Sequence, residues 1–307
     1  MRIRISTLVA ALFAAAAPAM AAELGMAAPA LSIDQWVKGA PVTIAPGDKI
    51  YVVEFWATWC GPCRVSIPHL TELQKKFKDK GVVFIGVSDE EADTVRPFVE
   101  QQGAAMDYAV AIDPSRKTHE KYMDAFDQRG IPTAFVIDKQ ARIVWVGHPM
   151  AELEEVIEGV LDGSYTVEKA KQREARRAQM METMGRFETA MNAGDKDKLN
   201  ASAEEILKTY SDEPRLLNAV AWTLLTYENK SLHNYPLALR MAKVAVDGSK
   251  EKDAAIMDTY ARALYETGDV KGAISHQQKA VALASSEQMK AELQKTLDSY
   301  QNGQAPK

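Results

Sequence analysis

Apolar residues in the first half of the chain form short continuous runs separated by stretches with helical spacing. The runs at residues 52–56 and 82–87 are typical of buried strands. Between them, apolar side chains recur every three or four residues at Ile67, Leu70, Leu73 and Phe77. A strand, a helix and a second strand in this order predict two parallel strands joined by a right-handed crossover.

The same reasoning predicts further elements up to residue 163. These are a helix around residues 95–99, a strand at 108–112, a helix at 117–126, a strand hairpin at 134–146 and a helix at 153–161. The hairpin turn is expected at residues 138–141. Gly163 follows the last helix, as glycine commonly does at a helix C-terminus.

After residue 164 the strand signals disappear, and the chain keeps a helical periodicity to about residue 300. A weak repeat is present, because Ala238 and Ala245 recur as Ala273 and Ala280, 35 residues later. Small residues let paired helices approach closely, and the period resembles that of tetratricopeptide (TPR) repeats. We therefore predict an all-α domain of TPR-like helical hairpins at residues 164–307, with a plain helical bundle as the alternative.

The first 22 residues have the pattern of a secretory signal. Arg2 and Arg4 give a positive start, residues 8–17 an apolar middle, and residues 19–21 a small-x-small cleavage site. The apolar run is short for a membrane span, and an uncleaved anchor is the alternative. We expect a signal peptide at 1–22 and a periplasmic or otherwise exported protein that is soluble after cleavage.

The chain contains two cysteines, Cys60 and Cys63, in the segment Trp59-Cys60-Gly61-Pro62-Cys63. Both thiols can lie in the first turn of a helix, where unpaired N–H groups and the helix dipole favour a thiolate on the first sulfur. Pro62 fits that turn, because its missing N–H is no loss there. A structural disulfide is the first alternative, although so short a loop removes little chain entropy. A zinc site is the second, although no further cysteine pair completes it.

The residues around this motif resemble a known family. Residues 54–63 resemble the active-site strand and elbow of thioredoxin, and residues 130–133 (Gly-Ile-Pro-Thr) resemble its cis-proline loop. The segment 89–113 is longer than a minimal thioredoxin allows, which is typical of exported TlpA/ResA-type proteins. The resemblance implies an α/β thioredoxin fold, with a central mixed sheet and flanking helices, in a redox domain at residues 23–163.

The resemblance also implies roles for individual residues. Cys60 would be the exposed nucleophile, Cys63 the buried resolving thiol and Glu54 the base that takes its proton, with an inert edge glutamate as the alternative. Pro132 would flank the sulfurs in a cis bond. The expected substrate contacts are Trp59, Gly61, Pro62 and the backbone of Ile131. A second acid is expected in the inserted segment, at Glu90 or Glu91.

These features predict an exported thiol–disulfide oxidoreductase that reduces disulfides in client proteins. The Gly61-Pro62 pair resembles that of reducing thioredoxins, and a membrane electron donor of the DsbD/CcdA kind would recharge the dithiol. No cofactor or metal is expected beyond the redox-active disulfide, and the helical repeats would recruit a protein partner. A net charge of −5 gives no electrostatic case for binding nucleic acid.

Other functions compete with this prediction. One is a disulfide oxidase or isomerase, and another is a TPR adaptor whose thioredoxin domain senses redox state. A copper chaperone using both cysteines and a histidine is a third. A peroxiredoxin is disfavoured, because Thr58 stands two residues before Cys60 where that family has a threonine three residues before.

Overall fold

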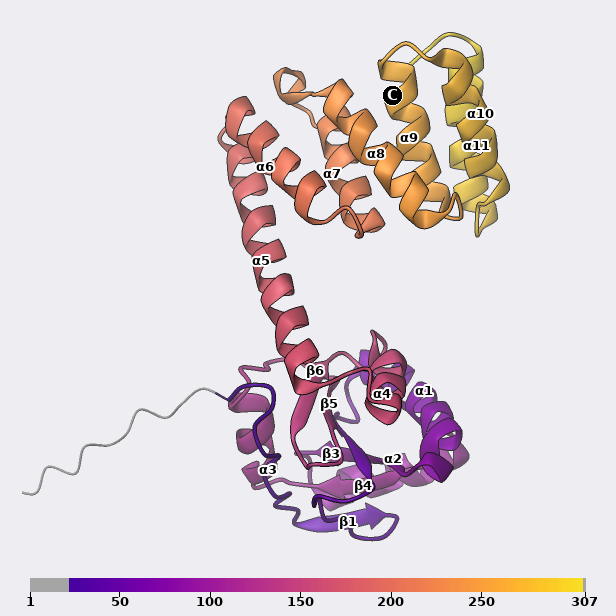
Figure 1. The fold of residues 1–307 in the computed structure, drawn as a ribbon. Coiled ribbons are helices and arrows are strands. Elements are labelled where there is room, and N and C mark those ends of the chain that lie inside the picture. Colours follow the sequence, from indigo (N-terminus) through magenta and orange to yellow (C-terminus); the bar gives the residue numbers. More distant parts are fainter. Residues whose placement is uncertain (1–21, 306–307) are drawn as a thin grey trace, which may run out of the picture. The chain divides into compact units, whose positions relative to one another are not determined.

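The computed structural model describes residues 22–305, and the chain divides into two compact units between Arg173 and Glu174 (Figure 1). The predicted signal peptide lies, apart from its last residue, Ala22, outside the described residues. Within the described part of the chain, no helix is both long and apolar enough to cross a membrane.

The described residues of the first unit form a six-stranded mixed sheet with the strand order β1-β4-β3-β2-β5-β6. The strands are β1 (Gln35–Lys38), β2 (Ile50–Phe55), β3 (Val82–Ser88), β4 (Ala109–Ile112), β5 (Thr133–Ile137) and β6 (Ile143–Gly147). β2, β3 and β4 run parallel, whereas β1, β5 and β6 are antiparallel to their neighbours. The predicted parallel pair and hairpin are confirmed, and the edge strand β1 was not predicted.

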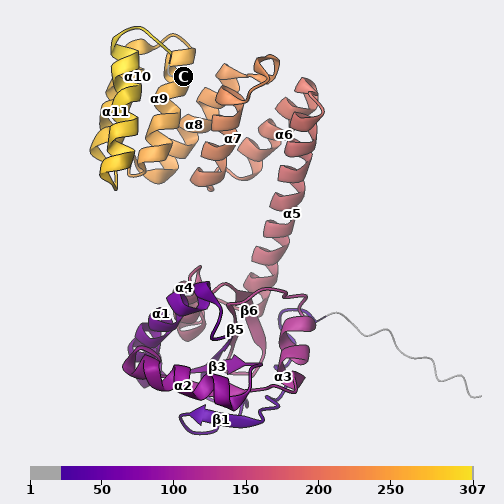
Figure 2. The same cartoon turned by 180° about the vertical axis from the view of Figure 1, so that it is seen from behind.

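Helices cover both faces of this sheet. The longer ones are α1 (Gly61–Phe77), α2 (Ala92–Gln102) and α4 (Leu153–Asp162). Both views place α1 and α4 on one side of the sheet and α3 (Lys117–His119) on the other (Figures 1 and 2). The prediction of one regular helix over residues 117–126 is wrong, because α3 is a single turn that continues as a π-helix over Glu120–Asp124.

The core of the first unit lies against both faces of the sheet. All six residues of β2 are buried, as its continuous apolar run predicted. The core also includes Tyr165, Val167 and Ala170, which follow Gly163 in the sequence. The first compact unit therefore continues to Arg173, while the domain boundary after residue 163 stays a prediction.

The second unit is helical, and its first helix, α5 (Val167–Asn192), contains the division between the units. The others are α6 (Lys196–Thr209), α7 (Pro214–Thr226), α8 (Tyr235–Ser249), α9 (Ala254–Glu266), α10 (Val270–Ala282) and α11 (Glu287–Gln301). Most start at a side chain that accepts a backbone N–H, namely Asp195, Asn234, Asp253, Asp269 and Ser286.

The alanines of the sequence repeat lie between packed helices. Ala238 and Ala245 of α8, and Ala273 and Ala280 of α10, are fully buried. α7 packs against α8, and α9 against α10. The close helix approach expected from these small residues is confirmed, while the assignment to TPR repeats stays a prediction.

Candidate functional site

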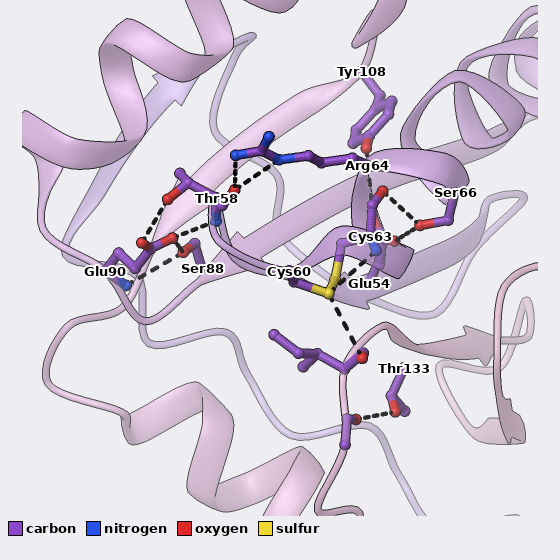
Figure 3. The surroundings of a disulfide bond; sticks show 12 residues. Glu54, Thr58, Cys60, Cys63, Arg64, Ser66, Ser88, Glu90, Tyr108 and Thr133 are labelled. Atoms are coloured by element: carbon purple, nitrogen blue, oxygen red, sulfur yellow. Dashed lines mark hydrogen bonds between the residues drawn. A yellow bond between two sulfur atoms is a disulfide. The ribbon is translucent and has the colours of Figure 1, made fainter.

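The two cysteines form a disulfide at the N-terminus of α1, just after the central strand β2 (Figure 3). Cys60 is the N-cap residue of α1, and its Sγ accepts the backbone N–H of Cys63 at 3.2 Å. Pro62 lies in the first turn, as expected. A sulfur at this position faces unpaired N–H groups and the positive end of the helix dipole, which favour a thiolate after reduction.

The disulfide is more enclosed than the sequence suggested. Cys63 is 0% exposed, and Cys60 is only 3% exposed, so the expectation of an exposed Cys60 is wrong for the disulfide form. The reason is the neighbouring loop, because the carbonyl oxygen of Ile131 lies 3.7 Å from the Cys60 Sγ. The Ile131–Pro132 peptide bond is cis. Trp59, in contrast, is 71% exposed beside the disulfide.

Glu54 is a buried carboxyl group on the central strand of the sheet, not an edge residue, because β2 lies between β3 and β5. Its Oε1 accepts a hydrogen bond from the Ser66 hydroxyl at 2.8 Å, and its Oε2 one from the Tyr108 hydroxyl at 3.4 Å. Burial raises the pKa of Glu54 to about 8, although both hydrogen bonds act in the opposite direction. The carboxyl group is therefore poised to exchange a proton near neutral pH.

Of the two acids expected in the inserted segment, Glu90 reaches the loop that precedes the cysteines. Its carboxylate accepts hydrogen bonds from the Thr58 backbone N–H at 2.6 Å and the Thr58 hydroxyl at 2.7 Å (Figure 3). The carbonyl of Thr58 accepts two further bonds from the Arg64 guanidinium, at 3.0 and 2.8 Å. Glu91 is instead the N-cap of α2 without a side-chain capping bond. Glu90 thus fixes the active-site loop through Thr58.

Trp59 and Ile131, the two neighbours of Cys60 described above, both line a pocket of about 300 Å³. Its apolar lining comes mainly from Phe55, Val87 and Met123, and its charged lining includes Asp89, Arg116, Asp124 and Arg129. His119 also lines it, and burial together with the nearby Arg116 lowers the pKa of His119. The pocket is therefore lined by both apolar and charged side chains.

Sequence reasoning assigned no role to Ser66, Tyr108 or the polar residues of this pocket. Ser66 did carry a signal, because it is a polar residue on the buried face of α1, three positions after Cys63. Arg116 is the N-cap residue of the short helix α3, and His119 is its last residue. Both line the pocket only because the fold brings α3 there. Among residues 22–305, no group of three or more His, Cys, Asp or Glu side chains is arranged to hold a metal ion.

Comparison with known proteins identifies the family. Residues 24–146 match the AhpC/TSA family. The chain is 31% identical to Protein FixW of Rhizobium leguminosarum over 167 residues, which are 52% of this chain and 75% of that protein. It is 38% identical over 93 residues to the thiol-disulfide oxidoreductase ResA of Bacillus thuringiensis strain Al Hakam, covering 30% of this chain and 50% of that protein.

The chain thus spans about half the length of its ResA relatives. A crystal structure of a thiol:disulfide interchange protein of the thioredoxin family from Chlorobium tepidum TLS matches with 29% identity and a TM-score of 0.37, over 46% of this chain and 99% of that one. Residues 24–146 therefore form an AhpC/TSA-type, thioredoxin-like domain that has homologues among the ResA thiol–disulfide oxidoreductases. Because it is 31% identical to FixW and covers 75% of that protein, the chain belongs to the same family as FixW.

Proposed function

We propose that this protein is an exported reductase that transfers two electrons from the Cys60/Cys63 dithiol to disulfides of client proteins. The observation that carries the proposal is the place of Cys60. Its sulfur caps α1, accepts the Cys63 N–H and lies beside the Ile131 carbonyl. Ile131 and Trp59, which precedes Cys60, also line a pocket. A thiolate there is stabilised by the helix and stands next to a backbone on which an extended client segment can dock.

The chemistry proceeds in two exchanges. The Cys60 thiolate attacks a client disulfide, forms a Cys60–client bond and releases the first client sulfur as a thiolate. Cys63 then loses its proton and attacks the Cys60 sulfur, and the Cys60–client bond breaks as its electron pair leaves with the second client sulfur. The dithiol has lost two electrons, the client disulfide has gained them, and the Cys60–Cys63 disulfide has formed.

The Trp59 indole, the Ile131 backbone and the pocket that both residues line would hold the client. The exposed indole of Trp59 and the backbone of Ile131 flank the pocket, where one client side chain would enter. Pro132 would hold the Ile131 carbonyl toward Cys60, and Gly61 would leave the approach open because it has no side chain. Glu54 would take the proton of Cys63, as its burial and raised pKa support.

The reducing direction and the location rest on sequence. Gly61-Pro62 between the cysteines resembles reducing thioredoxins, and the pattern of residues 1–22 supports export. Outside the cytosol thiols are oxidised, so a membrane electron donor of the DsbD/CcdA kind would return the protein to its dithiol form. The second unit contains no cysteine and has its own core, and we assign it the recruitment of a partner through TPR-like repeats.

Trapping of the mixed disulfide tests this function. We expect Cys63→Ser, which lacks the resolving thiol, to remain covalently attached to client proteins through Cys60. Cys60→Ser is the matched control and should capture nothing and lose disulfide reduction. Non-reducing gel electrophoresis followed by mass spectrometry identifies the adducts. Capture by Cys60→Ser but not by Cys63→Ser would reverse the two roles, and capture by neither would favour an adaptor without exchange chemistry.

A further inference from the structure

Two hydroxyl groups from distant parts of the chain hold the buried carboxyl group of Glu54. Ser66 lies on α1, whereas Tyr108 immediately precedes β4, 54 residues after Glu54. Each hydroxyl contacts a different carboxyl oxygen, and all three side chains are buried (Figure 3). A carboxyl group bound at both oxygens has a fixed orientation, which a buried group in an apolar site otherwise lacks.

The Ser66 hydroxyl also links Glu54 to the turn that carries Cys63. Its Oγ lies 2.8 Å from Glu54 Oε1 and 3.0 Å from the backbone carbonyl of Cys63. A hydroxyl has one proton and can also accept. Ser66 therefore donates to Glu54 when the carboxyl group is ionised. When Glu54 is protonated, it can donate to Ser66, whose own proton then serves the Cys63 carbonyl. The same side chain satisfies both protonation states.

Tyr108 complements this arrangement from the other side. Burial and the neighbouring Glu54 raise the pKa of Tyr108 well above its ordinary value, so the hydroxyl remains a donor at any pH near neutrality. The Tyr108 ring packs against Gly86, which has no side chain and pairs with Glu54 across β2 and β3. A Cβ at Gly86 would lie 3.1 Å from the Tyr108 ring and 3.0 Å from the Trp56 indole nitrogen.

Building on the reductase function proposed above, we propose that Ser66 and Tyr108 are positioning residues that hold the Glu54 carboxylate ready to accept the proton of Cys63. In the resolving step the proton moves from the Cys63 sulfur to Glu54, and the Cys63 sulfur bonds to the Cys60 sulfur. The client sulfur leaves with the electron pair of the broken disulfide. Neither hydroxyl touches the reacting sulfurs, so both act through Glu54.

In the described part of the chain, the Ser66 and Tyr108 hydroxyls are the groups that donate hydrogen bonds to the Glu54 carboxyl group. Across the sheet, Glu54 faces Gly86 of β3 and Ala134 of β5, which carry no charge. On α1, Cys63 lies one turn before Ser66, whose hydroxyl contacts both Glu54 and the Cys63 carbonyl. Within the described residues, the pKa of Glu54 responds to burial, to Ser66 and to Tyr108. Because both hydrogen bonds favour the carboxylate, losing either bond should make Glu54 a carboxylate only at higher pH.

The test separates attack from resolution in a single turnover of the reduced, full-length protein. The probe is a symmetric nitrobenzoate disulfide whose thiolate halves absorb visible light. The first release reports attack by Cys60, and the second reports resolution by Cys63. The variants are Tyr108→Phe and Ser66→Ala, alone and combined with Glu54→Gln. Tyr122→Phe is the matched control, because this buried tyrosine donates to the Pro29 carbonyl at 2.7 Å, away from Glu54.

We expect Tyr108→Phe and Ser66→Ala to slow the second release at pH 7 by roughly three- to tenfold, as loss of a hydrogen bond to a charged group implies. The pH at which the second release reaches half of its maximal rate should rise, and the rate of the first release should not change. In the Glu54→Gln protein neither substitution should add an effect. Tyr122→Phe should match the unmodified protein. Infrared titration of the Glu54 carboxyl in the oxidised variants gives a readout without turnover, and its midpoint should also rise.

Three results would overturn the proposal. They are an unchanged second release, equal slowing of both releases, and slowing that persists in the Glu54→Gln background. Each leaves the proposed reductase function intact, provided that Cys63→Ser still captures clients. A failure of that capture removes the reductase function instead, whatever the pH profiles show.

Discussion

At the residue scale, Glu54 links the stability of the fold to pH. A carboxyl group has an ordinary pKa of 4.5, and burial raises that of Glu54 to about 8 in the folded protein. Between these two values the folded state binds one proton more than the unfolded state, so folding stability decreases as pH rises. The stability that protonated Glu54 contributes to the folded state is fully present below pH 4.5 and is lost as the pH rises through 8. The site thus retains a group that opposes folding in alkaline conditions.

We predict that Glu54→Gln removes this loss, because the amide has no proton to release. Relative to the unmodified protein, the variant should gain stability between pH 5 and pH 9. The gain should approach several kcal/mol, on the order of 1.4 kcal/mol per unit of pKa difference. Urea unfolding of the oxidised protein across this pH range measures it. Glu72→Gln, which changes an exposed glutamate on α1, is the control and should leave the pH dependence unaltered. Parallel stability curves for Glu54→Gln and the unmodified protein would show that Glu54 is ionised throughout.

At the element scale, the packing of β2 against β3 makes room for the site. Gly86 of β3 lies opposite Glu54 of β2, and the Trp56 and Tyr108 rings fill the space above it. We predict that Gly86→Ala destabilises the first unit by about 1–3 kcal/mol, because the added methyl overpacks these rings. It should also slow resolution by Cys63, since it displaces Tyr108 from Glu54. Urea unfolding and single-turnover kinetics measure the two effects.

Gly185→Ala provides the contrast for that experiment. Gly185 lies within α5, and a Cβ there meets nothing within 4 Å. Alanine at this position should stabilise the helix by up to about 1 kcal/mol, because glycine is a poor helix former. Equal stability changes for the two glycines would contradict the packing argument for Gly86.

The elements that the sequence predicted well are those with a continuous apolar pattern, such as β2, β3 and α1. β1 was missed, because its four residues are half-buried or exposed and leave no apolar run. The π-helix after α3 was missed as well, since apolar spacing does not distinguish it from an α-helix. The disulfide and Glu54 followed from a local motif. Ser66 and Tyr108 did not, because their contacts with Glu54 exist only once α1 and β4 have packed beside β2.

At the scale of the whole molecule, the disulfide and the helices α6 to α11 belong to different units. The disulfide and its neighbours lie before Arg173, and the core there includes Tyr165, Val167 and Ala170. We predict that a shortened protein of residues 23–173 folds alone and reduces insulin as well as the full chain does. It should reduce its physiological client less well, by roughly a hundredfold if the second unit provides docking.

A second truncated protein, which ends at residue 163, tests where the first folded unit ends. It removes the three core side chains, each large one worth about 1.5–3 kcal/mol of burial, so it should be less stable by several kcal/mol. Thermal unfolding and insulin reduction compare the two proteins. Equal stability would place the end of the fold at Gly163. Undiminished client reduction by residues 23–173 would remove the role assigned to the helical unit.

Whether the Cys60/Cys63 pair donates electrons to clients depends on the midpoint potential of this couple. It can be measured by equilibrating the full-length protein in dithiothreitol buffers of known ratio and following thiol alkylation by mass spectrometry. Gly61-Pro62 between the cysteines predicts a reducing value, nearer to the about −270 mV of thioredoxin than to the about −120 mV of the oxidant DsbA. A potential close to that of DsbA would rule out a reductase, because such a pair would oxidise client thiols instead of reducing client disulfides.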